Sequence, residues 1–384
     1  MKMPVGYQKR KGAQLSRDNR NREFLYRQLS DILQKEISDG KYKPGQRLPS
    51  MDDLSEQYAV NKVTVRRALA ELSAAGIIYS VPAQGTYVSD RPRSTRLPAH
   101  NQVMTVGLLS YLMVPGNTGL YHMEIIQGIR EELSKMQANL VILPVRHVEP
   151  QIKIMDHISQ ANLDATIFLG MFDPPALRRM IELGPPSVLV DFSMRGIQID
   201  TILLDNRGGG YQAVNHLISL GHQRIAVILG QEDQVATKER LEGVYEAIDQ
   251  AGIPRSSLVI TVGDFQREGG YKAMSEILKV SEKPTAVFCF NDEMAAGALQ
   301  ALYSLSSLSV PRDISVIGFD DTAWATATQP PLTTVQVPKS LMGRLAVQRI
   351  MAHLREAQSP ITTVLPTQLV MRNSTAAPPP PVVR

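Results

Sequence analysis

From Val103 onward, short apolar runs alternate with amphipathic helical patterns, and no other feature limits the possible folds of this chain as strongly. Continuous apolar strands separated by amphipathic helices are typical of a parallel sheet that helices cover on both faces. Because residues 103–384 are too many for one such sheet, we predict two lobes. The predicted strands are Val103–Leu109, Asn139–Leu143, Asp164–Leu169, Ser187–Asp191, Arg224–Leu229, Leu258–Val262, Thr285–Phe290 and Ile314–Phe319. The predicted helices include Glu124–Met136, Tyr211–Leu220, Arg240–Gln250, Tyr271–Leu278 and Leu341–Leu354.

Residues 23–90 carry a second pattern, in which three helices precede a hairpin. Apolar residues recur at helical spacing between Leu25 and Ile37. Ser50 and Asp53 then form a helix start similar to a capping box. A third helix ends near Gly76 and buries Val65, Leu69 and Leu72. The hairpin is predicted from the strand-like runs Ile77–Val81 and Thr86–Val88.

Three stretches of this part of the chain stand out: Leu48-Pro49-Ser50, the run from Val60 to Leu69, and Gly85-Thr86-Tyr87-Val88. Together they resemble a winged helix-turn-helix of the GntR type. The resemblance implies that residues 23–90 bind DNA. A solvated charged helix face is the plainer alternative, but the cap, the turn and the wing together favour DNA.

The predicted DNA contacts lie at the start of the third helix and at the tip of the wing. A recognition helix must expose donors near its N-terminus, on the side away from its buried residues. The candidates are Asn61, Lys62, Thr64, Arg66, Arg67 and Gly85. The chain departs from the family in having Asp52 where an arginine commonly contacts DNA. We therefore expect an operator sequence different from that of typical relatives.

The alternating region also carries a series of ordered motifs. They are Leu203–Gly209, His216–Ala226, Glu239–Gly243, Phe290–Gly297, Ile314–Asp321 and Pro331–Val335. In this order they resemble the effector domains of LacI/GalR-type repressors. The resemblance implies two lobes similar to periplasmic sugar-binding proteins, joined by three crossings with a ligand between them. A GntR-type DNA-binding domain followed by a LacI-type effector domain resembles the arabinose-repressor group of bacterial regulators. This resemblance implies that a sugar controls transcription.

The predicted effector site lies at strand ends, which point into the crevice of open α/β lobes. A sugar needs planar acceptors and donors for its hydroxyls and an apolar ring for its C–H face. The candidates at strand ends are Asp191, Asn291 and Asp320. The resemblance implies that these three residues contact the ligand. It implies the same for Phe265, at the family's aromatic stacking position, and for Tyr121 and His122, at the start of the first helix of the effector domain. Taken singly, an Asp or Asn at a strand end is more often a helix cap.

One position departs from the sugar-binding relatives. Many of them have an arginine five residues before the glycine of the Arg-Leu-Glu-Gly motif, where this chain has Lys238. Arg240 stands three residues before that glycine, and we predict that both Lys238 and Arg240 contact the effector. Lysine supplies a point charge rather than a planar fork. Either Lys238 takes over the role with altered selectivity, or the ligand is not a typical hexose, and a phosphorylated or acidic sugar would be compatible.

Composition separates the front of the chain from its body. Residues 1–100 hold 18 Lys and Arg against 10 Asp and Glu, whereas residues 101–384 hold 23 against 27. Only the N-terminal part therefore carries the excess positive charge that suits a polyanionic binding partner. The single Cys289 lies in an apolar run and is predicted to be a buried thiol. The N-terminus lacks the apolar run of a secretion signal and no window is long and apolar enough to span a membrane, so we expect a cytoplasmic protein.

Three segments are expected to lie outside the folded domains. These are a disordered basic arm (residues 1–22), a linker (91–102) and a disordered proline-rich tail (373–384).

Two other classes of protein remain as alternatives. The loose Gly-x-Gly-x-x-Ala motif at residues 208–213 would suit a dinucleotide-using enzyme, but it is a weak signal in mid-chain. A transport sugar-binding protein would lack the winged helix and carry a signal peptide.

The sequence favours a homodimeric transcriptional regulator, most simply a repressor, on a pseudo-palindromic operator. The effector and dimerisation domain would span residues 103–372, with lobe 1 at about 103–206 and 338–366 and lobe 2 at about 207–337 and 367–372. We predict no catalytic residue, no cofactor and no metal.

Overall fold

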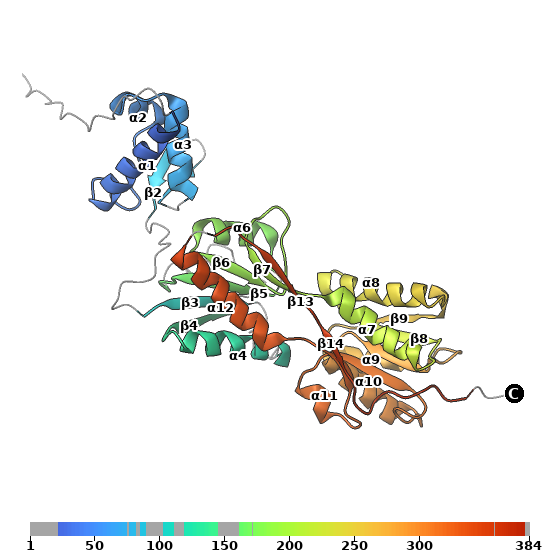
Figure 1. Cartoon of the computed structure of the whole chain (residues 1–384). Coiled ribbons are helices and arrows are strands. Elements are labelled where there is room, and N and C mark those ends of the chain that lie inside the picture. The colour runs from blue at the N-terminus through green and yellow to red at the C-terminus, as the bar shows by residue number, and fades with distance from the viewer. Residues whose placement is uncertain are drawn as a thin grey trace, which may run out of the picture. The chain divides into compact units, whose positions relative to one another are not determined.

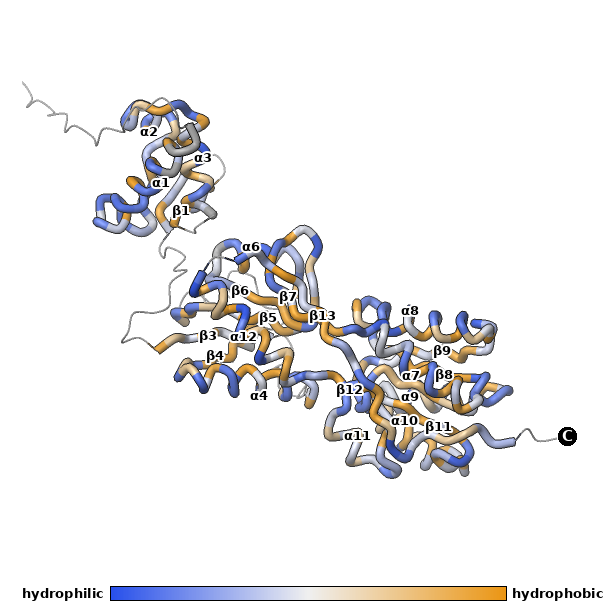
Figure 2. Tube along the Cα trace, in the orientation of Figure 1, coloured by the Kyte–Doolittle hydropathy of each residue, from blue (hydrophilic) through white to orange (hydrophobic). Residues whose placement is uncertain are grey.

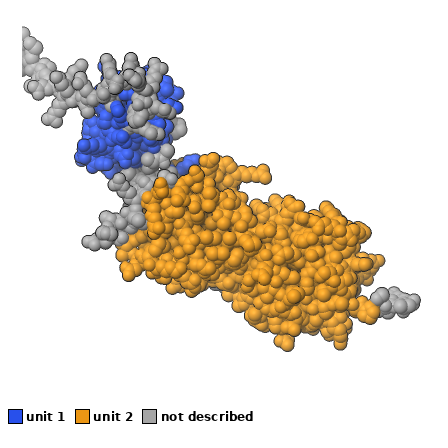
Figure 3. All heavy atoms as spheres, in the orientation of Figure 1, with its two compact units in different colours: residues 1–97, 182–186 blue, residues 98–181, 187–384 orange. Residues whose placement is uncertain are grey.

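The computed structural model of the 384-residue chain describes residues 22–74, 77–81, 85–89, 103–110, 119–144, 161–170, 172–356 and 358–380. It divides into two compact units, coloured separately in Figure 3. The first holds residues 1–97 with 182–186, and the second holds residues 98–181 with 187–384. The predicted basic arm, except for Arg22, and the predicted linker lie outside the described residues.

The first unit contains the three helices and the hairpin that the sequence predicts. They are α1 (Arg22–Ser38), α2 (Met51–Gln57), α3 (Lys62–Ala74), β1 (Ile78–Val81) and β2 (Gly85–Val88). The two strands pair antiparallel. Helix α2 starts with a full capping box, in which the Asp53 amide donates to Ser50 Oγ at 3.2 Å and the Ser50 amide donates to Asp53 Oδ2 at 3.0 Å. The apolar sides of the helices meet in one core that includes Leu29, Leu54, Val65 and Leu72.

The second unit contains two six-stranded sheets (Figure 1). In lobe 1 the strand order is β13-β7-β6-β5-β3-β4, all parallel. The bounds are β3 (Thr105–Ser110), β4 (Asn139–Pro144), β5 (Ala165–Leu169), β6 (Ser187–Val190), β7 (Asp200–Leu204) and β13 (Thr362–Leu365). In lobe 2 the order is β14-β12-β11-β10-β8-β9, parallel except for β14. The bounds are β8 (Ile225–Leu229), β9 (Val259–Val262), β10 (Ala286–Cys289), β11 (Ser315–Asp320), β12 (Thr333–Gln336) and β14 (Gln368–Val370).

Helices cover both sheets, as continuous apolar strands require. Strands β5, β8, β10 and β11 are buried at every residue. Figure 2 shows hydrophobic strands in both lobes between helices that alternate blue and orange. Cys289, on β10, is buried as predicted. The helices are α4 (Leu120–Ser134), α6 (Pro174–Leu183), α7 (Asn206–Ser219), α8 (Val235–Gln250), the 3-10 turn η1 (Arg255–Ser257), α9 (Arg267–Ile277), α10 (Asp292–Leu305), α11 (Ala323–Ala327) and α12 (Lys339–Arg355).

The chain crosses between the two lobes three times, which gives the predicted two-lobed α/β architecture. The crossings follow β7, follow β12, and separate β13 from β14. Helix α12 returns to lobe 1 and packs on α4, where Gly128 lies against the Ser340 carbonyl and Gly343 against the Ile125 carbonyl. An added Cβ at either glycine would come within 2.0–2.1 Å of the opposing oxygen. The two helices can therefore pack this closely only because both residues are glycine.

Two features differ from the sequence predictions. Strands β7, β12, β13 and β14 were not predicted, because they are short and carry polar residues among the apolar ones.

The segment 373–380 belongs to the fold rather than to a disordered tail. Buried Ser374 accepts a hydrogen bond from the Thr333 amide at 2.8 Å and donates to the Val316 carbonyl at 2.5 Å. The Ala376 amide donates to Ser315 Oγ at 3.0 Å. These polar contacts leave no periodic trace in the sequence.

No helix within the described part of the chain is both long enough and apolar enough to cross a membrane.

Candidate functional site

The inter-lobe site begins with three residues whose backbones are held in the left-handed region. Asp191 follows β6 with φ 67°, Phe265 follows β9 with φ 64°, and Asp320 ends β11 with φ 99°. Such conformations are costly for residues other than glycine and cluster at functional sites. Strand ends of both lobes therefore carry strained polar or aromatic residues at positions predicted for ligand contact.

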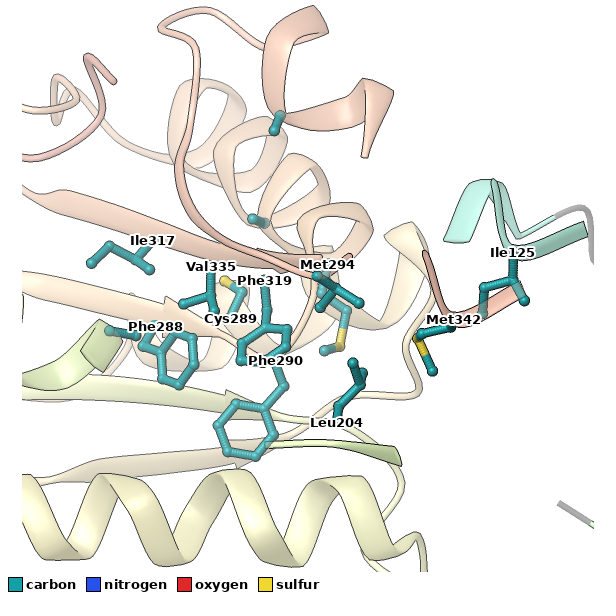
Figure 4. Close-up of a cluster of buried hydrophobic side chains, with 14 of the residues drawn as sticks. Ile125, Leu204, Phe288, Cys289, Phe290, Met294, Ile317, Phe319, Val335 and Met342 are labelled. Carbon is teal, nitrogen blue, oxygen red and sulfur yellow. The ribbon is translucent and has the colours of Figure 1, made fainter. Parts of the chain in front are cut away.

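Arg240 on α8 is the centre of the lobe 2 half of this site. The side chain is buried, and each guanidinium nitrogen faces a partner. Nε donates to Asn206 Oδ1 at 3.0 Å, one terminal nitrogen donates to the Phe290 carbonyl, and the other lies 3.5 Å from Asp320 Oδ1. The guanidinium also stacks over the Phe319 ring at 3.6 Å. Figure 4 shows the Phe319 and Phe290 rings beside Phe288 in the underlying core.

Charges from the two lobes act on one another within this site. Burial raises the pKa of Asp191, on lobe 1, to about 7, while the Arg240 charge and a hydrogen bond with Tyr121 oppose the rise. Burial also raises the pKa of Asp320, on lobe 2, against the charges of Arg240 and Lys339. Asp191 and Asp320 each raise the pKa of the Tyr121 hydroxyl, on lobe 1, although burial is the larger cause. The predicted acids, Tyr121 and Arg240 thus form one interacting group.

Tyr121 and His122 open helix α4, as predicted. Their rings meet edge to face with centroids 5.0 Å apart, and the Tyr121 hydroxyl lies 4.0 Å from Met342 Sδ. Burial lowers the pKa of His122 to about 4, so its ring is neutral near pH 7. His122 is therefore a polar wall residue with no charge to offer a ligand.

Asn291 acts first as a helix cap, the plainer alternative for this position. Its Oδ1 accepts the Met294 amide at 2.8 Å at the start of α10. Its Nδ2 donates to the Phe265 carbonyl at 2.9 Å, so the cap also fixes the loop that carries the predicted stacking ring. The Phe265 ring lies on Gly230, where a Cβ would come within 1.9 Å of the ring.

Helix α3, the predicted recognition helix, and the residue before it carry the predicted DNA contacts, most of them exposed. Asn61, Lys62, Arg66 and Arg67 are exposed and Thr64 is half-buried. Arg67 stacks over the Tyr26 ring of α1 at 5.5 Å, so part of its role is internal.

Gly85 starts the second strand of the wing with φ 121°, and an added Cβ would come within 2.5 Å of Arg47 Nε. Exposed Arg47, which the sequence analysis did not single out, therefore lies beside the wing. Its guanidinium adds a donor suited to DNA phosphate.

The comparisons with known proteins match both parts of the chain. Residues 25–88 match the family of bacterial regulatory proteins called gntR, and residues 214–375 match a periplasmic binding protein-like domain. The ribose operon repressor of Escherichia coli K12 is 31% identical over 304 residues, which are 78% of this chain and 89% of the repressor. A LacI family transcriptional regulator from Enterococcus faecium, solved with bound ribose, is 27% identical with a TM-score of 0.64, over 71% of this chain and 99% of that one. The chain belongs to the LacI family of transcriptional regulators. The structure of the transcriptional regulator CelR with cellobiose is 28% identical with a TM-score of 0.66, over 85% of this chain and 100% of CelR.

This LacI-family chain is therefore a ligand-responsive transcriptional regulator with a GntR-type DNA-binding domain. Its relatives are regulators rather than enzymes. The glycines that favoured a dinucleotide site have structural roles instead. The Gly208 amide donates to the Asp205 cap at 2.7 Å, and a Cβ at Gly210 would come within 2.2 Å of the Arg240 carbonyl, where α7 packs on α8.

The structure does not bring Lys238 into the group around Arg240. Lys238 is exposed, whereas Arg240, two residues later on α8, is buried. Side chains two residues apart on a helix point in different directions, so only one of the two can face the site. The position three residues before Gly243 therefore supplies the buried guanidinium.

Two residues of the site were missed by the sequence analysis. Asp292 is buried, accepts the Thr322 amide at 2.7 Å and the Thr334 hydroxyl at 2.5 Å, and has its pKa raised to about 8 by burial and by Asp320. Asp292 belongs to the Asn291-Asp292 motif, where the sequence alone suggests only a second helix cap.

The second is Lys339, which is buried at the start of α12. Its Nζ donates to the carbonyls of Asp320 and Asp321 and lies 3.3 Å from Glu124 Oε2. No sequence signal marked it. Because Glu124 belongs to lobe 1 and Asp320 to lobe 2, this ammonium ties the two lobes together beside the site.

Proposed function

We propose that this protein is a repressor that binds a pseudo-palindromic operator as a homodimer and responds to a neutral, unphosphorylated sugar. Residues 23–90 would read DNA, and residues 103–372 would bind the effector and dimerise. A two-fold dimer presents two copies of the same DNA-binding domain, which suits an operator with two inverted half-sites. Regulation of a bacterial chromosome would put the protein in the cytoplasm.

The observation that carries this proposal is the balance of donors and acceptors at the inter-lobe site. The two cations that act on Asp320 are Arg240 and Lys339, and both are buried and already bonded. Among the described residues, buried Asp320 Oδ1 has no hydrogen-bond donor, since Arg240 stands off at 3.5 Å. An unsatisfied buried acceptor is costly and calls for a donor such as a sugar hydroxyl.

The same distribution of charged groups disfavours a phosphorylated or acidic sugar, which the sequence analysis found compatible with Lys238. A phosphate or carboxylate placed beside Asp191 and Asp320 would meet like charge in a poorly hydrated site. Lys238, the cation that would have received it, is exposed. An amine is the remaining rival, because it would also suit two carboxylates.

The relatives support a sugar without fixing which one. The Enterococcus faecium regulator holds ribose and the CelR structure holds cellobiose. These sugars differ in size, so the effector of this chain has to be found by experiment.

The proposed response is a shift between relative orientations of the lobes. A sugar that contacts Asp191 on one lobe and Asp320 on the other binds best when the two approach each other, and so favours that orientation. A coupling of about 1–3 kcal/mol between effector and operator, typical of such systems, changes DNA affinity about 5- to 150-fold.

The test is a thermal-shift and calorimetry screen of the full chain against neutral sugars, sugar phosphates, sugar acids, amino sugars and nucleosides. We expect hits among neutral sugars only, and a ligand at about 100 times its Kd should add about 2.7 kcal/mol of stability. Asp191→Asn should lose most of the affinity for a hit, whereas Lys238→Ala, on the exposed side of α8, should keep it. Binding of a sugar phosphate, or loss of affinity in Lys238→Ala, would contradict the charge argument.

A further inference from the structure

Most polar groups at the start of the recognition helix are already engaged. Asn61 Oδ1 accepts both the Thr64 amide at 2.7 Å and the Thr64 hydroxyl at 2.9 Å, so this pair caps α3. Lys62 Nζ pairs with Asp52 at 2.7 Å. An exposed ion pair of this kind is weak, so Lys62 can exchange Asp52 for a DNA phosphate.

Two further residues, Val63 and Arg66, lie on the outward face of α3. Val63 has 67% of its surface exposed, and Arg66 is exposed one turn later. Residues three apart lie on the same side of a helix. Val65, Ala68 and Leu69 form the opposite, buried side. An apolar side chain is thus presented beside a guanidinium on the surface that enters the major groove.

We propose that Val63 recognises the methyl group of a thymine in the base pair adjacent to the one that Arg66 reads. This inference rests on the proposed function, because it requires that α3 binds operator DNA. The C5-methyl of thymine is the apolar group that bases display in the major groove, and arginine suits guanine. Three residues of helix advance about 4.5 Å, close to the base-pair spacing of about 3.4 Å, so the two side chains reach neighbouring pairs.

The chemistry of valine suits this role. Its χ1 is restricted in a helix, so little side-chain entropy is lost when the isopropyl group packs on a methyl. Burial of one methyl contributes about 0.8 kcal/mol, which corresponds to about a fourfold change in affinity.

The experiment measures methyl dependence with the full-length protein. A double-stranded DNA is first enriched from a random library by the protein itself, and each thymine is then replaced singly by deoxyuridine, which removes only the methyl. We expect one position in each half-site at which deoxyuridine weakens wild-type binding about fourfold. Val63→Ala should bind thymine and deoxyuridine equally at that position, and Arg66→Ala should lose discrimination at the adjacent guanine.

Val63→Thr is the matched variant, because it keeps the branched shape and one methyl, and it should retain part of the methyl dependence. Val63 is exposed, so none of these changes disturbs the core. A selected DNA that tolerates every deoxyuridine, or a methyl dependence that persists in Val63→Ala, would overturn this inference alone. Enrichment of no DNA at all would overturn the proposed function and the inference with it.

Discussion

Arg240→Met should destabilise lobe 2 strongly, whereas Lys238→Met, two residues earlier on the same helix, should have little effect. Methionine keeps most of the length and packing of the arginine over the Phe319 ring but removes the charge. The substitution leaves the Asp320 carboxylate buried without its nearest cation, 3.5 Å away. It also removes the donors to Asn206 and to the Phe290 carbonyl.

The size of the effect follows from these losses. Breaking a buried ion pair by removing one partner costs about 3–5 kcal/mol. The long 3.5 Å separation and the ability of Asp320 to take up a proton favour the lower end, about 3 kcal/mol. A surface substitution such as Lys238→Met stays within about 0.5 kcal/mol.

The effect should also depend on pH. Without the arginine charge, the folded-state pKa of Asp320 rises further above its unfolded value, so the folded protein holds a proton that the unfolded chain has lost. Stability arising from this protonation is lost as the pH increases through the folded pKa. The deficit of Arg240→Met should therefore be larger at about pH 8 than at about pH 5.

Urea denaturation read from the fluorescence of Trp324, the single tryptophan, reports on lobe 2 directly. Adding Asp320→Asn to Arg240→Met should restore part of the lost stability, because it removes the unpaired charge. Equal midpoints for Arg240→Met and Lys238→Met at both pH values would refute the assignment of Arg240 as the buried partner of Asp320.

Three further outcomes are expected. Gly230→Ala should weaken effector binding severely while operator binding persists, because the added methyl occupies the place of the Phe265 ring; calorimetry checks this, and an unchanged Kd would contradict it. Sugar affinity should increase from about pH 6 to about pH 8 as Asp191, with its pKa near 7, becomes a full acceptor, and Asp191→Asn should flatten that titration. Arg66→Ala should weaken operator binding by about 1–3 kcal/mol and leave effector binding intact, as measured by fluorescence anisotropy and calorimetry on the same preparation; loss of both activities would argue against two separate modules.

The sequence determined the architecture because the patterns it depends on are local. Continuous apolar strands between amphipathic helices predict two covered parallel sheets, and the Ser50–Asp53 start predicts the capping box that α2 carries. Asp191 and Asp320 could be found because each ends a recognisable apolar strand. Strands β7 and β12–β14 escaped prediction because they are short and mix polar with apolar residues, so no continuous apolar run marks them.

Only the tertiary structure decided which side chains meet. The sequence offered both Lys238 and Arg240 as effector contacts, and the direction in which each projects from α8 buries Arg240 and leaves Lys238 exposed. Lys339 and Ser374 carry no periodic signal, yet each satisfies buried carbonyl groups of strand β11 or the loop that follows it. Helix and strand periodicity are properties of neighbouring residues, whereas a buried charge finds its partner through the packing of distant segments.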